Sequence, residues 1–413
     1  MSPNSTSRFI RACLRQPVDR TPVWFLRQAG RYMPEYMAVR KHHSLLDICR
    51  TPSIAAEVTI TAAERLGVDA AIIFADLLLP LTPMGLDFEF INGEGPVIHQ
   101  PLRTLDQIRA LRTDRTPDLS YVAEAITRVA THFNNKRPAS PDAQDTLGII
   151  GFCGAPFTLA SYMIEGGSSR NYIETKQLMY ASAPSSPSPQ DRHSERSPQG
   201  GVEEPRESSP HHHSQHLSAT NPQHNSAWPF LMSKLVDVLT DFAAQQISAG
   251  ADVIQVFDSW AGALSVADYR AYALAPTTEL IRRIQALGVP VIYFGVDTAS
   301  LLPTFRETAA DVLGLDWRIP LDAGWRAVGP QTAVQGNLDP ITLFAPDAVL
   351  EARVREILQQ AANRPGHIFN LGHGIVPNTP VDQVLRVVDL IKRHGHTTPH
   401  ASNEATSDWA IRA

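Results

Sequence analysis

The sequence predicts an α/β fold in the form of a single (β/α)8 barrel of the TIM type. Three observations lead to this prediction: short apolar runs alternate with longer amphipathic segments, the alternation repeats eight times, and several short runs are apolar throughout. Strands that are apolar throughout are typical of parallel sheets covered on both faces. Eight β/α units in a chain of 413 residues favour a barrel over an open doubly wound sheet, although periodicity does not show closure.

The eight predicted strands are short runs rich in β-branched and aromatic residues. In chain order they cover residues 22–25, 70–74, 147–152, 251–257, 289–295, 311–316, 332–337 and 367–372. We expect them to form one domain over residues 1–413, with its core at about residues 9–393.

Helices between these strands have recognisable beginnings and ends. One begins at Thr51 and ends at Gly67, another runs from Ser265 to Gly288, and the last begins at Thr379. Serine and threonine favour the position before a helix, and glycine favours the position after it. The last helix carries apolar residues at three- and four-residue spacing, which indicates one buried face.

Two segments interrupt the pattern of strands and helices. Residues 87–100 indicate a β-hairpin turning at Asn92 and Gly93, an excursion on the rim of the barrel. Residues 181–227 contain 11 Ser, 7 Pro and 6 of the 15 His with almost no large apolar side chain, so we expect a disordered insert. Residues 396–413 are expected to form a flexible tail.

Composition excludes several classes of protein. A net charge of −6 does not indicate the basic surface that binding to nucleic acid or to an acidic membrane would need. The three cysteines, Cys13, Cys49 and Cys153, have no CxxC spacing and indicate reduced thiols. Residues 1–17 lack a continuous apolar stretch, and no run approaches 18 apolar residues. We therefore expect a cytoplasmic protein.

Polar side chains follow most of the predicted strands at their C-terminal ends, which meet at one mouth in a β/α barrel. In strand order they are Arg27 and Arg31, Asp76, Asp258 and Ser259, Asp316, Asn337 and Asp339, and His373. After the third strand, residues 154–156 begin a helix whose free N–H groups face the same mouth, and Tyr162 lies within that helix. The sequence therefore predicts one cleft with arginines on one side and a carboxylate on the other.

Most of these side chains also have structural interpretations. Asp76 is placed to cap a helix, and Tyr162 is placed to pack in the core. His373 is placed to bond a neighbouring carbonyl group, and Arg31 is at helical spacing from Glu35. Arg27 has no such local explanation, because it directly follows a buried strand and has no acidic neighbour.

Five motifs together resemble the uroporphyrinogen decarboxylases of haem biosynthesis, in their bacterial form. They are FLRQAGRYMPEY, IIFADLLLP, FCGAPFTLASYMIEGG, VFDSWAG and FNLGHGI, and the resemblance extends from about residue 9 to 393 apart from the insert. It implies a homodimeric β/α barrel that removes carboxyl groups from the four acetate arms of uroporphyrinogen III. The implied products are coproporphyrinogen III and four carbon dioxide molecules, and the implied enzyme needs no metal or organic cofactor.

The resemblance also implies roles for individual residues. Asp76, Arg27 and Tyr162 are the expected catalytic residues, with Asp76 stabilising a cation and Arg27 acting as proton donor or carboxylate anchor. The expected substrate-binding residues are Arg27, Gln28, Ala29, Gly30, Arg31, Arg40, Asp76, Tyr162, Ser259 and His373. Neither a metal site, a nucleic-acid site nor a membrane contact is expected.

Three alternative functions remain. A corrinoid or thiol methyltransferase of the same superfamily would need zinc ligands, including a cysteine near the last strands, and no cysteine follows Cys153. A non-catalytic tetrapyrrole-binding protein could retain the arginines and lose Asp76, which is present. An unrelated phosphate-binding barrel would need a glycine-rich loop after the seventh and eighth strands.

Overall fold

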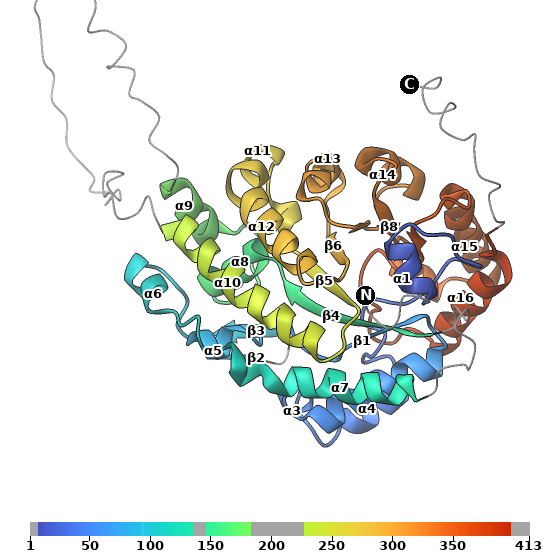
Figure 1. Ribbon diagram of the computed structural model, residues 1–413, viewed down its shortest axis with the longest axis horizontal. Helices are drawn as coiled ribbons and strands as arrows, with labels where there is room; N and C mark the ends of the chain where they lie inside the picture. The colour runs from blue at the N-terminus through green and yellow to red at the C-terminus, as the bar shows by residue number, and fades with distance from the viewer. Residues whose placement is uncertain (1–6, 92, 94, 136–145, 183–226, 398–413) are drawn as a thin grey trace, which may run out of the picture.

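The computed structural model describes residues 7–91, 93, 95–135, 146–182 and 227–397. Seven strands form one parallel sheet in the order β1-β4-β5-β6-β7-β8-β9. Their bounds are β1 Ala70–Ile72, β4 Gly148–Gly154, β5 Val253–Asp258, β6 Val291–Gly295, β7 Val312–Gly314, β8 Ala333–Gln335 and β9 His367–Ile368. The sheet curls around the centre of the molecule, and helices surround it (Figure 1).

The first predicted strand, residues 22–25, is not a regular strand, and this prediction was wrong in its detail. The segment nevertheless lies between the two edge strands of the sheet. The Phe369 N–H donates to Pro22 O (2.8 Å), and the Asp69 N–H donates to Val23 O (2.8 Å). The ladder is interrupted because the Asp69 side chain accepts the Val23 N–H (2.8 Å) and Pro22 has no N–H to give. The segment therefore closes the barrel through isolated bonds.

Polar side chains cross the inside of the barrel and tie this irregular segment to the strands. The indole N–H of Trp24 donates to Gln335 Oε1 (3.0 Å), and Gln335 Nε2 donates to Gln255 Oε1 (3.4 Å). All three side chains are buried. Because buried polar groups are costly without partners, these bonds fix where the segment lies against β5 and β8.

The helices follow the order expected for β/α units, and long helices such as α10 and α16 bury an apolar face. The α-helices are α1 Arg8–Cys13, α2 Pro34–Arg40, α3 Leu45–Arg50, α4 Pro52–Leu66, α5 Leu81–Met84, α6 Leu105–Ala110, α7 Ser120–Asn134, α8 Pro156–Glu165, α9 Ile173–Ala181, α10 Ala227–Ser248, α11 Val266–Asp268, α12 Leu274–Gln285, α13 Leu302–Phe305, α14 Leu321–Val328, α15 Asp347–Ala361 and α16 Val381–His394. As predicted, α4 ends before Gly67, whose positive φ of 64° suits glycine. The helix predicted from Ser265 is less regular, because a π-helical stretch, Tyr269–Ala273, separates α11 from α12.

The predicted rim hairpin is present as β2 (Phe88–Ile91) paired antiparallel with β3 (Gly95–Ile98). Asn92 of its predicted turn lies outside the described residues. Most of the predicted insert, residues 183–226, also lies outside them, and α9 and α10 flank it. Within the predicted tail, His396 pairs with Arg20 as an antiparallel bridge, and residues 398–413 lie outside the described residues.

Charged residues tie α1 to the N-terminal ends of the strands. Buried Arg8 pairs with Asp19 (2.6 Å) and with Asp69 (2.8 Å), and Arg20 pairs with Asp69 (2.7 Å). Asp69 thus accepts bonds from two guanidinium groups while it also holds the Val23 N–H. These ion pairs order the end of the barrel opposite to the mouth.

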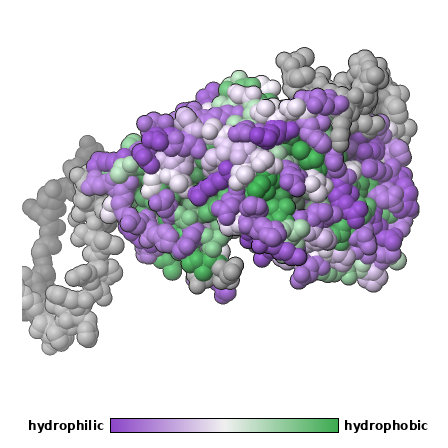
Figure 2. Space-filling view, turned by 90° about the horizontal axis from the view of Figure 1, so that it is seen from below, coloured by the Kyte–Doolittle hydropathy of each residue, from purple (hydrophilic) through white to green (hydrophobic). Residues whose placement is uncertain are grey.

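The three cysteines are free, as predicted, and all three are buried. No helix within the described residues is long and apolar enough to cross a membrane. The face that carries α3, α4 and α7 is mostly polar, with apolar side chains gathered in patches (Figure 2).

Candidate active site

The C-terminal ends of the strands bring the predicted site residues to one end of the barrel. Arg27 follows the irregular segment 22–25, Asp76 follows β1, Ser259 follows β5, and His373 follows β9. Tyr162 lies in α8, which starts directly after β4. This convergence follows from the parallel order of the strands.

Asp76 is half-buried and uses one oxygen to hold a turn. Its Oδ1 accepts the Leu78 N–H (2.9 Å), and Oδ2 has no hydrogen-bond partner among the described residues. Burial raises the pKa of the Asp76 carboxyl, while the Leu78 N–H and the charge of Arg27 oppose this shift. The carboxylate therefore caps a turn with one oxygen and has the other free to meet a donor.

Arg27 lies in the left-handed region, with φ of 60°, and extends over Gly374. Its guanidinium makes no hydrogen bond or ion pair with any described residue. Burial lowers the pKa of Arg27 and the charge of Arg31 lowers it further, whereas Tyr162 and Asp76 raise it. The charges of Arg31, Asp76 and Tyr162 thus act on Arg27, which remains the cation expected at neutral pH.

Residues 28–31 form a loop with unused main-chain donors. The Gln28 side chain is buried, accepts the Phe25 N–H (3.2 Å) and donates to Ala70 O (3.1 Å), so it anchors the loop. The N–H groups of Ala29, Gly30 and Arg31 have no hydrogen-bond partner among the described residues. Successive free N–H groups next to arginines suit a carboxylate ligand.

Arg31 does not pair with Glu35, the alternative that its spacing suggested. Glu35 lies 3.6 Å from Arg65 instead. Arg31 is exposed and has no ion-pair partner among the residues that the structure describes. Arg40, at the end of α2, is half-buried and donates to His43 O. Two arginines of this segment, Arg27 and Arg31, therefore have no ion-pair partner in the described part of the chain.

Tyr162 stacks on an aromatic neighbour at the same end of the barrel. Its ring lies 3.8 Å from that of Trp260, centroid to centroid, with 32° between the planes. Burial raises the pKa of Tyr162, the charge of Asp76 raises it further, and Arg27 opposes both. The phenol therefore stays protonated near neutral pH, and its O–H can donate a hydrogen bond.

His373 is half-buried beside the same arginine. Burial lowers the pKa of His373, and the charge of Arg27 lowers it further. Its Nδ1 lies 3.4 Å from Gly374 O, a long contact that leaves the ring oriented mainly by its neighbours. The ring is neutral at neutral pH, so it can both donate and accept hydrogen bonds. Ser259 is half-buried next to Asp258.

Two strand-end carboxylates are used by the protein itself. Asp316 is buried, accepts the Asp297 N–H (2.5 Å) and pairs with Arg318 (3.1 Å). Asp339 accepts the Ile341 N–H (2.9 Å) and so caps the short 3₁₀ helix Pro340–Phe344. Both carboxylates hold loops in place through these bonds and so have a structural role.

Sequence reasoning missed several aromatic and cationic residues around the mouth. Trp260 stacks on Tyr162, and Trp317 lies 6.1 Å from His373, centroid to centroid. The Arg318 guanidinium lies 3.9 Å from the Trp317 ring centroid, a cation–π contact. Both tryptophans directly follow strand-end residues already singled out, and that position was the available signal.

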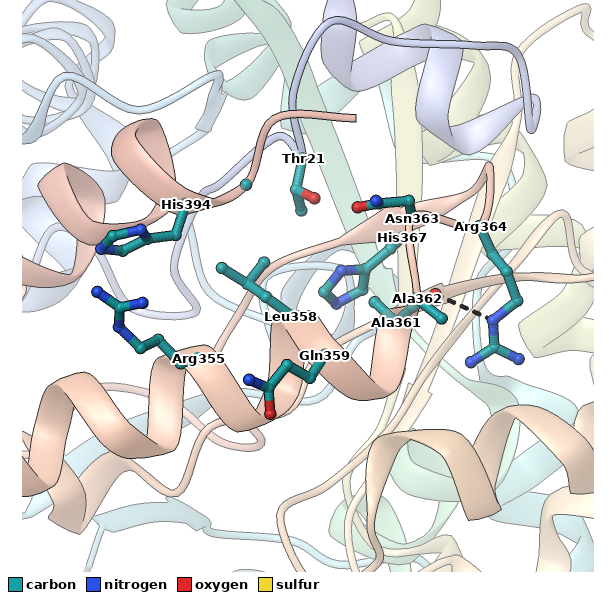
Figure 3. A pocket seen from close by; sticks show the side chains of 11 residues that line it. Thr21, Arg355, Leu358, Gln359, Ala361, Ala362, Asn363, Arg364, His367 and His394 are labelled. Carbon is teal, nitrogen blue, oxygen red and sulfur yellow. Dashed lines mark hydrogen bonds between the residues drawn. The ribbon is translucent and has the colours of Figure 1, made fainter. Parts of the chain in front are cut away.

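A separate hollow of about 300 Å³ lies at the opposite end of the barrel (Figure 3). Thr21, which precedes the first segment, His367, which begins β9, and Gly395, which follows α16, are among its lining residues. Since these residues lie at the N-terminal ends of the strands, the hollow is not part of the mouth.

His367, in the wall of this hollow, is expected to lower stability at acid pH. The ring is buried, its Nε2 lies 3.1 Å from Gly336 O, and burial lowers its pKa to about 4. The unfolded chain takes up the proton near pH 6.5 and the folded chain only near 4, so the free energy of unfolding falls as pH falls through this window. The loss by pH 4.5 is about 2 kcal/mol.

Denaturant unfolding at pH 7 and pH 4.5 tests this expectation. The free energy of unfolding of the wild type should fall between pH 7 and pH 4.5. In His367→Gln this fall should be smaller by about 2 kcal/mol. The matched control is His132→Gln, because His132 pairs with Glu64 at the surface (2.7 Å). An equal pH dependence in the wild type and His367→Gln would contradict the expectation.

Comparisons with known proteins identify the family of this chain. The family model "Uroporphyrinogen decarboxylase (URO-D)" matches residues 4–186 and 207–394. A uroporphyrinogen decarboxylase of Koribacter versatilis is 56% identical over 394 residues, which cover 95% of this chain and 97% of that protein. Another, from Solibacter usitatus, is 46% identical and covers 94% of this chain and 97% of its own length.

A solved structure supports the fold. A methyltransferase from Methanosarcina mazei superposes with a TM-score of 0.65 at 17% identity, covering 94% of this chain and 97% of the other. At this identity the likeness shows the fold alone and not the activity. The family model and the relatives instead show that this chain belongs to the uroporphyrinogen decarboxylase family.

Proposed function

We propose that this protein is a carboxy-lyase that converts uroporphyrinogen III to coproporphyrinogen III by removing the carboxyl groups of its four acetate arms. The observation that carries the proposal is the Asp76 carboxylate, which has one oxygen free and lies within electrostatic range of Arg27 and Tyr162 at the mouth. Family membership supplies the substrate. The corrinoid or thiol methyltransferase alternative is not better supported.

The chemistry requires a place for the electrons that the departing carboxyl group leaves behind. Protonation of the adjacent pyrrole carbon turns the ring into an iminium-like cation, which accepts those electrons as carbon dioxide leaves. A second proton then converts the arm into a methyl group, and loss of the proton from the ring carbon restores the pyrrole. The substrate itself thus provides the electron sink that a cofactor provides in other decarboxylases.

Asp76 is proposed to stabilise this cation. Its free oxygen is available to accept pyrrole N–H groups, and its negative charge offsets the positive charge formed on protonation. Burial of the carboxylate strengthens this effect, because charges interact more strongly where little water screens them. The carboxylate is also already in place when the cation forms, so no rearrangement of the site is needed.

The substrate's carboxylates need donors at several points of the cleft. We propose that Arg27, Arg31 and Arg40, together with the N–H groups of the loop after Arg27, bind the arms. His373, Ser259 and the Tyr162 O–H are the neutral groups proposed to orient the reacting arm.

Two roles are proposed for Arg27, proton donor and carboxylate anchor, and the anchor role is better supported. Burial and Arg31 lower its pKa, but an arginine normally has a pKa above about 12 and is a weak acid. A guanidinium without a protein partner is well placed to bind a carboxylate in a bidentate way. The proton could then come from Arg27 or from a bound water molecule.

We further propose that the enzyme works without metal or organic cofactor, as a cytoplasmic homodimer. The proposal rests on the family's pattern and on the sequence, which has no basic footprint for nucleic acid and no apolar stretch for a membrane.

An anaerobic assay tests the proposed function. Purified protein, treated with a chelator, is incubated with uroporphyrinogen III, and the oxidised products are separated by their number of carboxyl groups. Seven-, six-, five- and four-carboxyl porphyrins are expected in succession, which requires decarboxylation without added metal. Unchanged eight-carboxyl material from folded protein would reject the proposal.

A further inference from the structure

A chain of hydrogen bonds connects the barrel core to Trp260, which stacks on Tyr162, and its bonded residues have no role in the proposed function. Its centre is Asp258, the last residue of β5, which is fully buried. The Thr158 O–H donates to Asp258 Oδ1 (2.6 Å), and the Tyr293 O–H donates to Oδ2 (2.7 Å). Each carboxylate oxygen therefore has one hydroxyl donor, which is the pattern expected for an ionised carboxylate.

One branch of this chain leads to the cleft. The Thr158 hydroxyl also accepts the main-chain N–H of Trp260 (3.2 Å), and the Trp260 ring stacks on Tyr162 at 3.8 Å. Thr158 and Tyr162 are four residues apart in α8, so they lie on the same side of that helix. Trp260 also contacts the ring of Tyr172 at 5.1 Å, so aromatic rings on two sides fix its position.

The other branch leads away from the cleft. The Tyr293 hydroxyl lies 2.8 Å from that of Tyr269, and both tyrosines are fully buried. Both rings pack against Phe305, at 4.5 and 5.1 Å between centroids. None of these three residues is among the proposed substrate contacts.

A buried carboxylate is expensive to keep in a hydrophobic interior. Burial raises the pKa of Asp258 to about 6, and the bonds from Thr158 and Tyr293 partly oppose this shift. An apolar side chain of similar volume often costs less stability at such a position. The cost suggests that the carboxylate serves a purpose other than stability.

We propose that Asp258 and Thr158 are positioning residues, which hold the Trp260 main chain and thereby fix the Tyr162 ring against the reacting acetate arm. This inference rests on the proposed function, because it assigns the Tyr162 hydroxyl a place beside the substrate. Misplacement of an orienting group by about 1 Å can cost on the order of 10²-fold in rate. Loss of the Thr158 bond should therefore affect catalysis as well as folding.

Two variants that remove matching hydroxyl groups test the proposal. Thr158→Val breaks the branch to the cleft and keeps the β-branched shape, whereas Tyr293→Phe breaks the other branch at the same carboxylate. Both are expected to lower Tm to a similar extent, since each removes one bond to Asp258. The value of kcat/KM is expected to fall roughly tenfold or more in Thr158→Val and to stay within about twofold in Tyr293→Phe.

A double-mutant cycle separates positioning from a general loss of structure. If Thr158 acts through the Tyr162 hydroxyl, Thr158→Val should change kcat/KM less than about twofold in a Tyr162→Phe background. Equal losses of kcat/KM in Thr158→Val and Tyr293→Phe would overturn this inference but not the proposed function. Fully additive losses of kcat/KM in the double-mutant cycle would do the same. A folded wild-type protein without decarboxylase activity would overturn the proposed function, and the inference with it.

Discussion

Asp76→Asn is expected to lower kcat by on the order of 10²- to 10³-fold while leaving the fold intact. Asparagine keeps an oxygen for the Leu78 N–H, so the turn after β1 should be preserved. It lacks the negative charge that is proposed to stabilise the protonated pyrrole ring. Its NH2 group is a hydrogen-bond donor, so it would replace an acceptor opposite the pyrrole N–H groups. Initial rates of anaerobic uroporphyrinogen decarboxylation, together with Tm, measure the two effects separately.

The matched control for this variant is Asp339→Asn. Asp339 follows β8 at the same end of the barrel and caps the 3₁₀ helix Pro340–Phe344 through the Ile341 N–H. Asparagine is an equally good cap, so the rate is expected to stay within about twofold of wild type. Near-normal turnover in Asp76→Asn would reject the proposed role of the carboxylate.

Arg27→Lys is expected to lower kcat/KM on the order of 10²-fold, although it keeps the positive charge. Lysine lacks the planar fork that binds a carboxylate through two parallel bonds, and its flexible side chain is less well preorganised. The guanidinium has no partner among the described residues, so little folding stability should be lost. Separate measurement of kcat and KM distinguishes the two proposed roles of Arg27.

A change confined to KM would support the carboxylate anchor, and an equal fall in kcat would support the proton donor. Arg353→Lys is the matched control, because Arg353 is exposed on α15 and, among the described residues, pairs only with Glu356 (2.8 Å). An Arg27→Lys enzyme with unchanged kcat/KM would contradict both roles.

Gly374 offers a second way to displace the same side chain. A methyl group at this position would lie 2.7 Å from Cγ of Arg27, so the arginine would have to move. Gly374→Ala should therefore reproduce part of the loss seen in Arg27→Lys, with Arg27 itself still present. In an Arg27→Lys background the added alanine should have a smaller effect.

The sequence located most of the elements because their signals are local. The helix α4 was predicted from Thr51 to Gly67 and runs from Pro52 to Leu66, since a proline and a glycine mark its ends within the chain itself. The strand β4 was predicted from an unbroken apolar run, and all seven of its residues are buried. The segment 22–25 was also predicted as a strand, but it does not form a regular one. The side chain of Asp69, 46 residues away, accepts the Val23 N–H that a regular ladder would use.

The sequence by itself determined the family, the order of the β/α units and the positions of Arg27, Asp76 and Tyr162, because motifs and periodicity are written along the chain. Only the tertiary structure showed that Asp316 and Asp339 bond to loops. It also showed that Asp76 has an oxygen without a partner among the described residues. It also placed Trp260 against Tyr162, since that contact depends on Thr158 meeting a main-chain N–H 102 residues away. Bonds between such distant residues depend on how the barrel closes, and no local pattern encodes them.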